Sequence, residues 1–380
     1  MTKIHVTHVG SLPRGPELTP LLLARDHGEA YDEAEFDRVV QKAVDEAVAK
    51  QVEAGVSIIS DGELGKVGYS TYMIERLKGF GGHTDRMPAA DLAPLPDLRK
   101  KLAVMMGDQD FTRASCIEKV ELVTLQPLYD DIRRFKSAIE KNGKGVRAFM
   151  NAASPGLITA FQKNAFYPSH EAYLADLVDA MKSEYEAIVD AGFELQLDCP
   201  DLAMSRHTGY QNASEEEFLK IAAANVEALN AATANIPADK MRMHICWGNY
   251  EGPHDHDIPL ERVIDIVLKA RPSTILFEGA NPRHEHEWIV WRDAQIPDDK
   301  ILAPGMIDTC SNYLEHPELI AQRIERFAGI FGADRVIAST DCGFGTFAGY
   351  GKIDPAVTWA KLRSLHEGAE LAAARIGVPA

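Results

Sequence analysis

The stretch RMHICWGNYEG, from Arg242 to Gly252, has the pattern of a β-strand that ends abruptly in a loop. In a strand, residues two apart project from the same face. His244 and Cys246 are therefore expected to point the same way, as two ligands of one metal ion must. A His-x-Cys pair alone is more often a core histidine and a buried thiol, so a metal site requires further ligands.

Short β-rich runs of this kind alternate with longer helical patterns along the whole chain. The nine runs are HVTHVGS from His5, VSIISDGE from Val56, EKVELVT from Glu118, VRAFMNAASPG from Val146, FELQLDCP from Phe193, MRMHICWG from Met241, STILFEGA from Ser273, ILAPGMIDT from Ile301 and RVIASTDCG from Arg335. Helical spacing is found at residues 33–54, 169–191, 214–233, 260–270 and 316–332. This repetition favours a (β/α)8 TIM barrel over a doubly wound sheet, although nine runs compete for eight places.

One region does not follow the repeat. Residues 79–115, which include FGGHTDRMPAADLAPLP from Phe80, match neither a strand nor a simple crossover helix, and we expect an insertion near the active-site face. The segment from Pro355 is expected to close the fold as a helix. Residues 1–380 are thus predicted to form a single catalytic barrel.

Composition narrows the class of protein. The chain has 380 residues, of which 46% are hydrophobic and 26% charged, as in globular proteins with a full core. Its net charge of −17 argues against nucleic acid or an anionic membrane as a partner. No apolar run approaches the roughly 20 residues of a membrane span, and the five cysteines have no disulfide-framework spacing. We expect a cytoplasmic protein, and the sequence leaves open whether it is a homo-oligomer.

Residues suited to metal binding, substrate binding or acid–base chemistry stand at the C-terminal ends of the predicted strands. In a barrel these ends surround one site. They carry Gly10 and Ser11, Asp61 and Glu63, Asp198, His244 and Cys246, Glu278, Asp308 and Cys310, and Asp341 and Cys342. Four of them, His244, Cys246, Glu278 and Cys342, are ligands of zinc type from three strand ends. Taken singly, Glu278 also suits a helix N-terminus and Cys342 a tight Gly-rich turn.

The motifs THVGSLPR, SDGE, LDCPDL, HIC, FEG and STDCG stand in the order and approximate spacing of the catalytic barrel of cobalamin-independent methionine synthases. The resemblance covers nearly the whole chain, from Val6 to about Gly343. It implies a catalytic Zn²⁺ held by His244, Cys246, Glu278 and Cys342. Two thiolates and a carboxylate make such a zinc suited to activating a small thiol rather than water.

The resemblance also assigns the residues that bind the thiol substrate. Gly10 and Ser11 resemble a pair that holds its polar head group, and Glu63 and Asp198 match acids that hold the amino group of homocysteine. A tight turn for Gly10 and Ser11, and helix N-caps for the two acids, are the alternatives.

The chain departs from these enzymes where the methyl donor binds. Cys310, two residues after Asp308, stands where the family has a proton-donating His, and the segment after the SPG turn has Phe161 and Phe166 but no Trp. Cys199 replaces the acid after Asp198. We therefore expect an epoxide or another activated alkyl donor, with Asp308 and Cys310 as catalytic residues, and methyl transfer from methyltetrahydrofolate to homocysteine as the alternative.

Two further alternatives concern the thiol and the class of reaction. The chain also resembles epoxyalkane:coenzyme M transferase, whose thiol carries a sulfonate, and Arg14 and Lys66 are candidates to bind such an anion. A different class is a metal-free decarboxylase of the uroporphyrinogen decarboxylase type. Metal analysis separates the decarboxylase from the zinc transferases.

Overall fold

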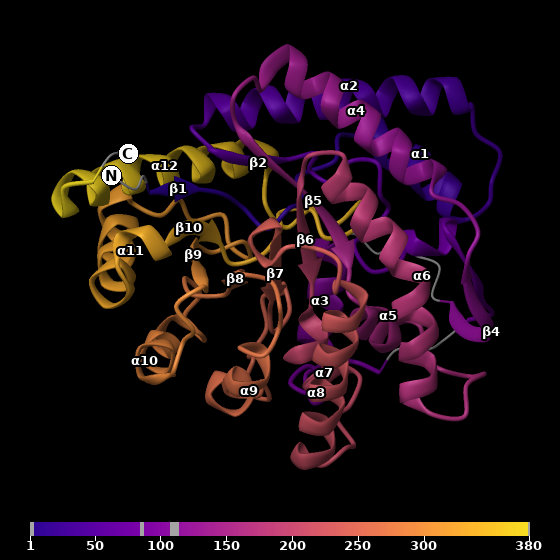
Figure 1. Ribbon diagram of the computed structural model, residues 1–380. Helices are drawn as coiled ribbons and strands as arrows, with labels where there is room; N and C mark the ends of the chain where they lie inside the picture. The colour runs from indigo at the N-terminus through magenta and orange to yellow at the C-terminus, as the bar shows by residue number, and fades with distance from the viewer. Residues whose placement is uncertain (1–3, 84–86, 107–113, 379–380) are drawn as a thin grey trace.

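The computed structural model describes residues 4–83, 87–106 and 114–378, and its centre is a barrel of parallel strands wrapped by helices (Figure 1). The strands are hydrogen-bonded in the order β1-β10-β9-β8-β7-β6-β5-β2. Their bounds are β1 (His5–Val6), β2 (Ile58–Ser60), β5 (Arg147–Ala153), β6 (Glu194–Asp198), β7 (Met241–Ile245), β8 (Thr274–Phe277), β9 (Ile301–Ile307) and β10 (Ile337–Thr340).

Hydrogen bonds also join β1 to β2, the two ends of this order. The backbone N–H of Ser57 donates to the carbonyl of Val6 at 3.0 Å, and the Thr7 hydroxyl donates to the carbonyl of Ile58 at 3.0 Å. The eight strands therefore form a (β/α)8 barrel, as predicted, and not a doubly wound open sheet.

Helices cover the outside of the barrel. The five predicted helical segments agree with α2, α6, α8, α9 and α11 to within three residues at each end. Side-chain caps explain several starts: Ser214 and Glu217 form a reciprocal capping box at the start of α8. No helix among the described residues is long and apolar enough to cross a membrane. The helices of the barrel are α1 (Leu18–Asp26), α2 (Glu33–Glu53), α4 (Gln126–Asn142), α5 (Pro155–Phe161), α6 (His170–Asp190), α7 (Ser205–Thr208), α8 (Glu215–Ala232), α9 (Leu260–Val267), α10 (Trp288–Asp293), α11 (Pro317–Phe331) and α12 (Pro355–Ile376).

The ninth predicted strand lies outside the barrel. β4 (Ser115–Leu122) pairs antiparallel with β3 (Leu77–Gly81) and packs on α6 at the periphery (Figure 1). Its Cys116 and Val120 are buried, whereas the intervening residues 117–119 are exposed, as in a ribbon with one packed face. The insertion is confirmed, but it is not free of regular structure: it contains the end of β3 and the helix α3 (Pro96–Met106). Residues 84–86 and 107–113 of this region lie outside the described residues.

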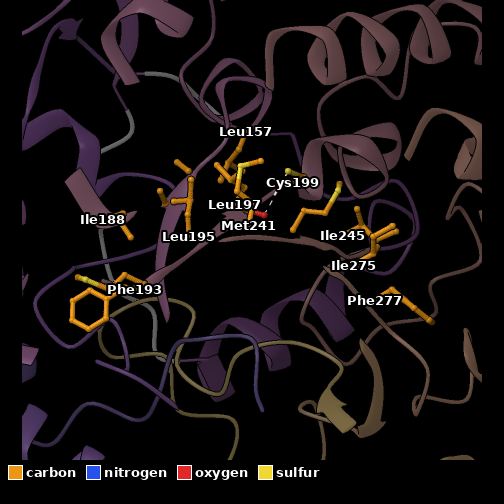
Figure 2. Packing of buried hydrophobic residues seen from close by; sticks show 14 of the residues in the cluster. Leu157, Ile188, Phe193, Leu195, Leu197, Cys199, Met241, Ile245, Ile275 and Phe277 are labelled. Carbon is orange, nitrogen blue, oxygen red and sulfur yellow. Dashed lines mark hydrogen bonds between the residues drawn. The ribbon is translucent and has the colours of Figure 1, made fainter. Parts of the chain in front are cut away.

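Alternation along the strands separates the core from the site. Figure 2 shows Leu195 and Leu197 of β6 in the apolar layer between strands and helices, which also contains Met241 and Ile245 of β7. Because side chains alternate in a strand, the residues between them face the barrel interior. Asp198 and His244 belong to this second set, so the period of two places them on the inner side of neighbouring strands.

The barrel interior is filled and not hollow. A compact apolar cluster occupies it, formed by Val9, Ile58, Phe149, Leu276, Ala303 and Ile337. The buried Arg242 guanidinium lies 3.9 Å from the centre of the Phe149 ring and donates to the Thr7 hydroxyl at 3.1 Å and the His8 carbonyl at 2.9 Å. The barrel is thus closed below the C-terminal ends of its strands, where this fold usually carries its site.

Candidate active site

Three of the four predicted metal ligands meet at the C-terminal ends of β7 and β10. His244 lies within β7, Cys246 directly follows it, and Cys342 lies two residues after β10. Each offers a ligand atom, and these atoms all lie within 4.8 Å of one another. Two strands separate β7 from β10 in the sheet, so the curvature of the barrel brings the three side chains together.

The His244 ring is oriented as a metal ligand needs to be. Its Nε2 lies 3.1 Å from the backbone oxygen of Asp341. Since a carbonyl only accepts, Nε2 carries the hydrogen in this contact. Burial lowers the pKa of His244 to about 4, so the ring is neutral at pH 7 and Nδ1 keeps a lone pair. A backbone acceptor on the opposite ring nitrogen is the usual way to fix a ligating histidine.

The two thiols lie against each other. The pKa of Cys246 is raised well above its ordinary value, because its thiol hydrogen-bonds with that of Cys342 and because it is buried. A bound cation reverses this effect, since a coordinated thiol is deprotonated. One imidazole nitrogen and two sulfurs form a donor set that fits Zn²⁺.

Glu278, the fourth predicted ligand, directly follows β8 and lies beside this group. One carboxylate oxygen accepts from the backbone N–H of Trp247 at 2.7 Å, and the other from the Asn281 amide at 2.6 Å. Its loop is held by Asp341, which accepts from the backbone N–H groups of residues 279–281 at 2.8–2.9 Å. Burial raises the pKa of Glu278. Its oxygens are not among the three ligand atoms that lie within 4.8 Å of one another.

One cavity joins the two thiols to three of the predicted substrate-binding residues, Ser11, Glu63 and Asp198. Gly10 does not line it; its φ is +144°, and a Cβ there would be 2.3 Å from the Asn151 side-chain oxygen. Only glycine permits this approach. The cavity is lined by Val9, Ser11, Glu63, Tyr69, Asp198, Pro200, Met204, His244, Cys246, Asn249, Cys342, Gly343 and Thr346.

Glu63 and Asp198 form a buried acidic pair. Asp198 accepts from the side-chain amides of Asn151 and Gln196, each at 3.2 Å, and burial raises its pKa to about 6. Burial, together with repulsion from Asp198, raises the pKa of Glu63 to about 8. Oε2 of Glu63 is buried without a hydrogen-bond partner. An acceptor left free in a cavity of this kind suits a cationic group such as an ammonium.

Arg14 and Lys66 are engaged elsewhere and do not line this cavity. The Arg14 guanidinium donates to the carbonyls of Lys66 and Glu63, each at 3.0 Å, and to that of Gly345. The Lys66 ammonium donates to the Asn151 carbonyl at 2.6 Å and lies 4.2 Å from the centre of the Tyr72 ring. Both cations thus tie loops together around the cavity.

Cys310 and Asp308 are not among the residues that line this cavity. The Cys310 thiol donates to the side-chain oxygen of Asn249 at 3.1 Å, and burial raises its pKa. Asp308 accepts from the backbone N–H of Cys310 at 2.8 Å, so its carboxylate holds the turn. Contact between Cys310 and the cavity therefore runs through Asn249.

Sequence reasoning did not assign Asn249, which connects two strand ends. Its amide donates to the Gly343 carbonyl at 2.8 Å and to the Thr346 hydroxyl at 3.0 Å. The available signal was its place in a Gly-Asn turn three residues after Cys246. An adjoining cavity, which shares Tyr69, Met204, Asn249 and Thr346, adds Phe161, Phe347 and Tyr350 to its wall. Phe166 does not line it and is half exposed.

The fold and the arrangement of the site are those of a (β/α)8 barrel with a His-Cys-Cys group at the C-terminal ends of its strands, and comparison with known proteins places it beside methionine synthases. The chain is 23% identical over 371 residues to the methionine synthase of Saccharolobus solfataricus, covering 96% of this chain and 93% of that protein. It is 24% identical over 344 residues to the methionine synthase of Sulfurisphaera tokodaii, covering 89% and 85%.

A solved structure of a B12-independent methionine synthase from Shewanella sp. W3-18-1, in complex with selenomethionine, matches with a TM-score of 0.71. The identity is 18%, and the match covers 98% of this chain and 99% of that one. No protein-family model matches the sequence. The resemblance to cobalamin-independent methionine synthases is thus confirmed over nearly the full length, and the structural match confirms the barrel.

Proposed function

We propose that this protein is a zinc-dependent transferase that alkylates the sulfur of a small amino-acid thiol. The observation that carries the proposal is a single cavity with a His-Cys-Cys group on one wall and a buried pair of carboxyl groups on another. His244, Cys246 and Cys342 would hold the zinc, with Glu278 as the fourth ligand. The relatives named methionine synthase, which match over 93% and 85% of their own lengths, support transfer to a thiol.

The metal's contribution is the positive charge that lets an incoming thiol bind as a nucleophilic thiolate near neutral pH. The chain's own residues do the rest. His244 is fixed by the Asp341 carbonyl, and Glu278 is fixed by Trp247 and Asn281. Such outer contacts keep ligands aligned while a substrate enters. Glu278 would be the hardest donor of the set and therefore the one least matched to zinc.

The buried acids favour a thiol that carries an amino group. An ammonium beside Glu63 would satisfy its unpartnered Oε2 and lower its pKa from about 8. A sulfonate would meet the same two acids unfavourably, and Arg14 and Lys66 already donate to backbone carbonyls. These contacts favour homocysteine, or a thiol like it, over coenzyme M.

For the alkyl donor, we propose an epoxide or another activated alkyl compound. The cavity that adjoins the thiol site has aromatic side chains in its wall, from Tyr69, Phe161 and Phe347. Cys310, where methionine synthases of this type have a proton-donating His, is a poor acid, because burial raises its pKa further. Transfer from methyltetrahydrofolate is the second candidate, supported by the names of the relatives.

Metal analysis of cysteine variants tests the proposed centre. Cys246→Ala and Cys342→Ala should each lose most of the zinc bound at this site, because each removes one of its thiolates. Cys199→Ala is the matched control: that thiol is equally buried but packs in the apolar layer, where it contacts the Leu197 carbonyl (Figure 2). Full zinc content in both active-site variants would refute the centre, and a protein that never binds zinc would favour the decarboxylase.

A donor assay tests the reaction. The unmodified protein, Cys310→Ala and Cys310→His are each given homocysteine with an epoxide or with methyltetrahydrofolate. We expect the epoxide to react faster with the unmodified protein, and Cys310→His to gain most with the folate, since it restores a proton donor. Methionine formation by the unmodified protein at about 1 per second or faster would replace the epoxide with the folate.

A further inference from the structure

A second group of metal-type side chains lies outside the proposed zinc centre, around Asp257. His254 Nδ1 and His284 Nε2 are each 2.9 Å from the same Asp257 oxygen, Oδ2. The three ligand atoms lie within 4.8 Å of one another. The side chain of Asp257 is 3% exposed, and those of His254 and His284 are 11% and 4% exposed. The group is therefore almost closed to solvent.

The opposite nitrogen of each ring is committed to an acceptor. Nε2 of His254 lies 2.9 Å from the Tyr250 carbonyl, and Nδ1 of His284 lies 2.9 Å from the Glu287 carboxylate. Because a carbonyl and a carboxylate accept, these nitrogens carry hydrogens. In the neutral rings, Nδ1 of His254 and Nε2 of His284 then each direct a lone pair at Asp257. Metal-binding histidines are held in this way.

A third histidine repeats the pattern. The Tyr250 hydroxyl donates to Asp91 at 2.8 Å, so its oxygen is left to accept from Nε2 of His207 at 3.4 Å. Nδ1 of His207 then faces the other Asp257 oxygen, Oδ1, at 3.1 Å. Neither of these two atoms has a hydrogen-bond partner, although both are buried. His207 is 1% exposed.

Two arrangements would relieve the repulsion between these lone pairs and the carboxylate. A second proton on both His254 and His284 is the first, and the hydrogen bonds to Asp257 raise the pKa of both rings, but it gives Nδ1 of His207 and Oδ1 of Asp257 no further partner. One divalent cation brings the same two positive charges and also accepts a lone pair from His207. The cation therefore accounts for His254, Asp257 and His284, whose ligand atoms lie within 4.8 Å of one another; His207 is not in that group and adjoins it through Asp257.

We propose that His207, His254, Asp257 and His284 form a second divalent-metal site, distinct from the cysteine-containing centre. Three imidazoles and one carboxylate suit Zn²⁺ or a similar transition-metal ion, and the absence of thiolates separates this ion from the first. The site is closed and all its ligands come from protein, so its role is structural.

The placement of the site indicates what it stabilises. His254 and Asp257 lie in the loop after β7, His284 lies in the loop after β8, and His207 lies in α7. The Trp247 ring stacks on His284 with centroids 4.3 Å apart, and its backbone N–H donates to Glu278. Asp91 of the insertion accepts from the His254 backbone N–H at 2.9 Å. The ion would thus fasten two loops, α7 and the insertion around the proposed active site.

The test uses full-length, untagged protein and Zn²⁺ itself. A Cys246→Ser/Cys342→Ser variant removes the first centre and leaves every histidine in place. After chelator treatment and dialysis it should still bind one Zn²⁺ per chain by calorimetry. Loaded with Co²⁺, it should show ligand-field bands without sulfur-to-cobalt charge transfer. His254→Ala/His284→Ala should lose this second ion and keep the first, whereas His256→Ala, an exposed neighbour, should keep both.

The outcomes separate this site from the proposed active centre. Absence of Zn²⁺ binding to the folded cysteine variant would overturn the second site whatever the histidine variants do. Zn²⁺ binding by the cysteine variant that persists when His254→Ala and His284→Ala are added to it would also overturn the second site. An unmodified protein that binds a single Zn²⁺, and loses it in His254→Ala/His284→Ala, would leave this inference intact and refute the zinc centre of the proposed function.

Discussion

Replacing Glu63 with Gln should stabilise the ligand-free protein at alkaline pH and abolish recognition of an amino-acid thiol. The fold raises the pKa of this acid from its ordinary value of 4.5 to about 8, mainly by burial and then by repulsion from Asp198. Below pH 4.5 the group is protonated in both the folded and the unfolded chain and costs nothing. Between pH 4.5 and 8 only the unfolded chain loses the proton, so stability falls as pH rises.

The size of the effect follows from the same two pKa values. The full difference corresponds to about 5 kcal/mol above pH 8, and we expect the substitution to recover only part of it, because a buried amide in place of the carboxyl also needs hydrogen-bond partners. We expect Glu63→Gln to be more stable than the unmodified protein by about 2–4 kcal/mol at pH 9 and by almost nothing at pH 5.

Urea denaturation at the two pH values measures this difference. Glu53→Gln is the control, because Glu53 is exposed at the end of α2 and should change stability by no more than about 0.5 kcal/mol at either pH. Calorimetry with homocysteine follows the loss of binding. A variant that is no more stable than the unmodified protein at pH 9, or that still binds homocysteine normally, would refute the reasoning.

Three further predictions concern the backbone, the loop after β8 and the thiol. Gly10→Ala should destabilise the protein by about 3–5 kcal/mol, because it strains φ at +144° and displaces the Asn151 side chain from Asp198. The control Gly192→Ala, at φ +95° with no atom within 4 Å of the added Cβ, should cost only about 1–2 kcal/mol, and equal losses of stability in the two variants would contradict the clash at Gly10. Asp341→Ala should cost about 3 kcal/mol and weaken zinc binding about 10- to 100-fold, since it frees the loop that carries Glu278; unchanged zinc affinity would exclude that coupling. Thiol binding near pH 7 should release protons, counted by calorimetry in buffers of different ionisation enthalpy, and zero release or net uptake would remove the thiolate mechanism.

Much of the barrel could be predicted because its signals are local. Helix starts at Asp32, Ser169 and Ser214 carry capping side chains, and the alternation in β6 and β7 directs Asp198 and His244 inward. The ninth predicted strand carries no local signal that it lies outside the barrel. The run from Glu118 does form a strand, and only its pairing with β3 removes it from the barrel.

The site was harder to predict wherever side chains are used by their neighbours. Strand ends located His244, Cys246 and Cys342, but no pattern in the sequence indicates that Arg14 and Lys66 donate to distant carbonyls. The histidine group around Asp257 draws on two loops and α7, with His207 fifty residues before Asp257 along the chain. Spacing alone did not connect these residues.

The most direct test of a metal-activated thiol is selenium K-edge X-ray absorption of selenohomocysteine bound to the zinc-loaded protein. Selenium replaces the reacting sulfur, so its first shell reports the nucleophile and is insensitive to how many other zinc ions the chain holds. We predict a zinc neighbour in the first shell of selenium, lost in Cys246→Ala and kept in Cys199→Ala. A selenium atom with carbon as its only first-shell neighbour in the saturated complex would contradict the account.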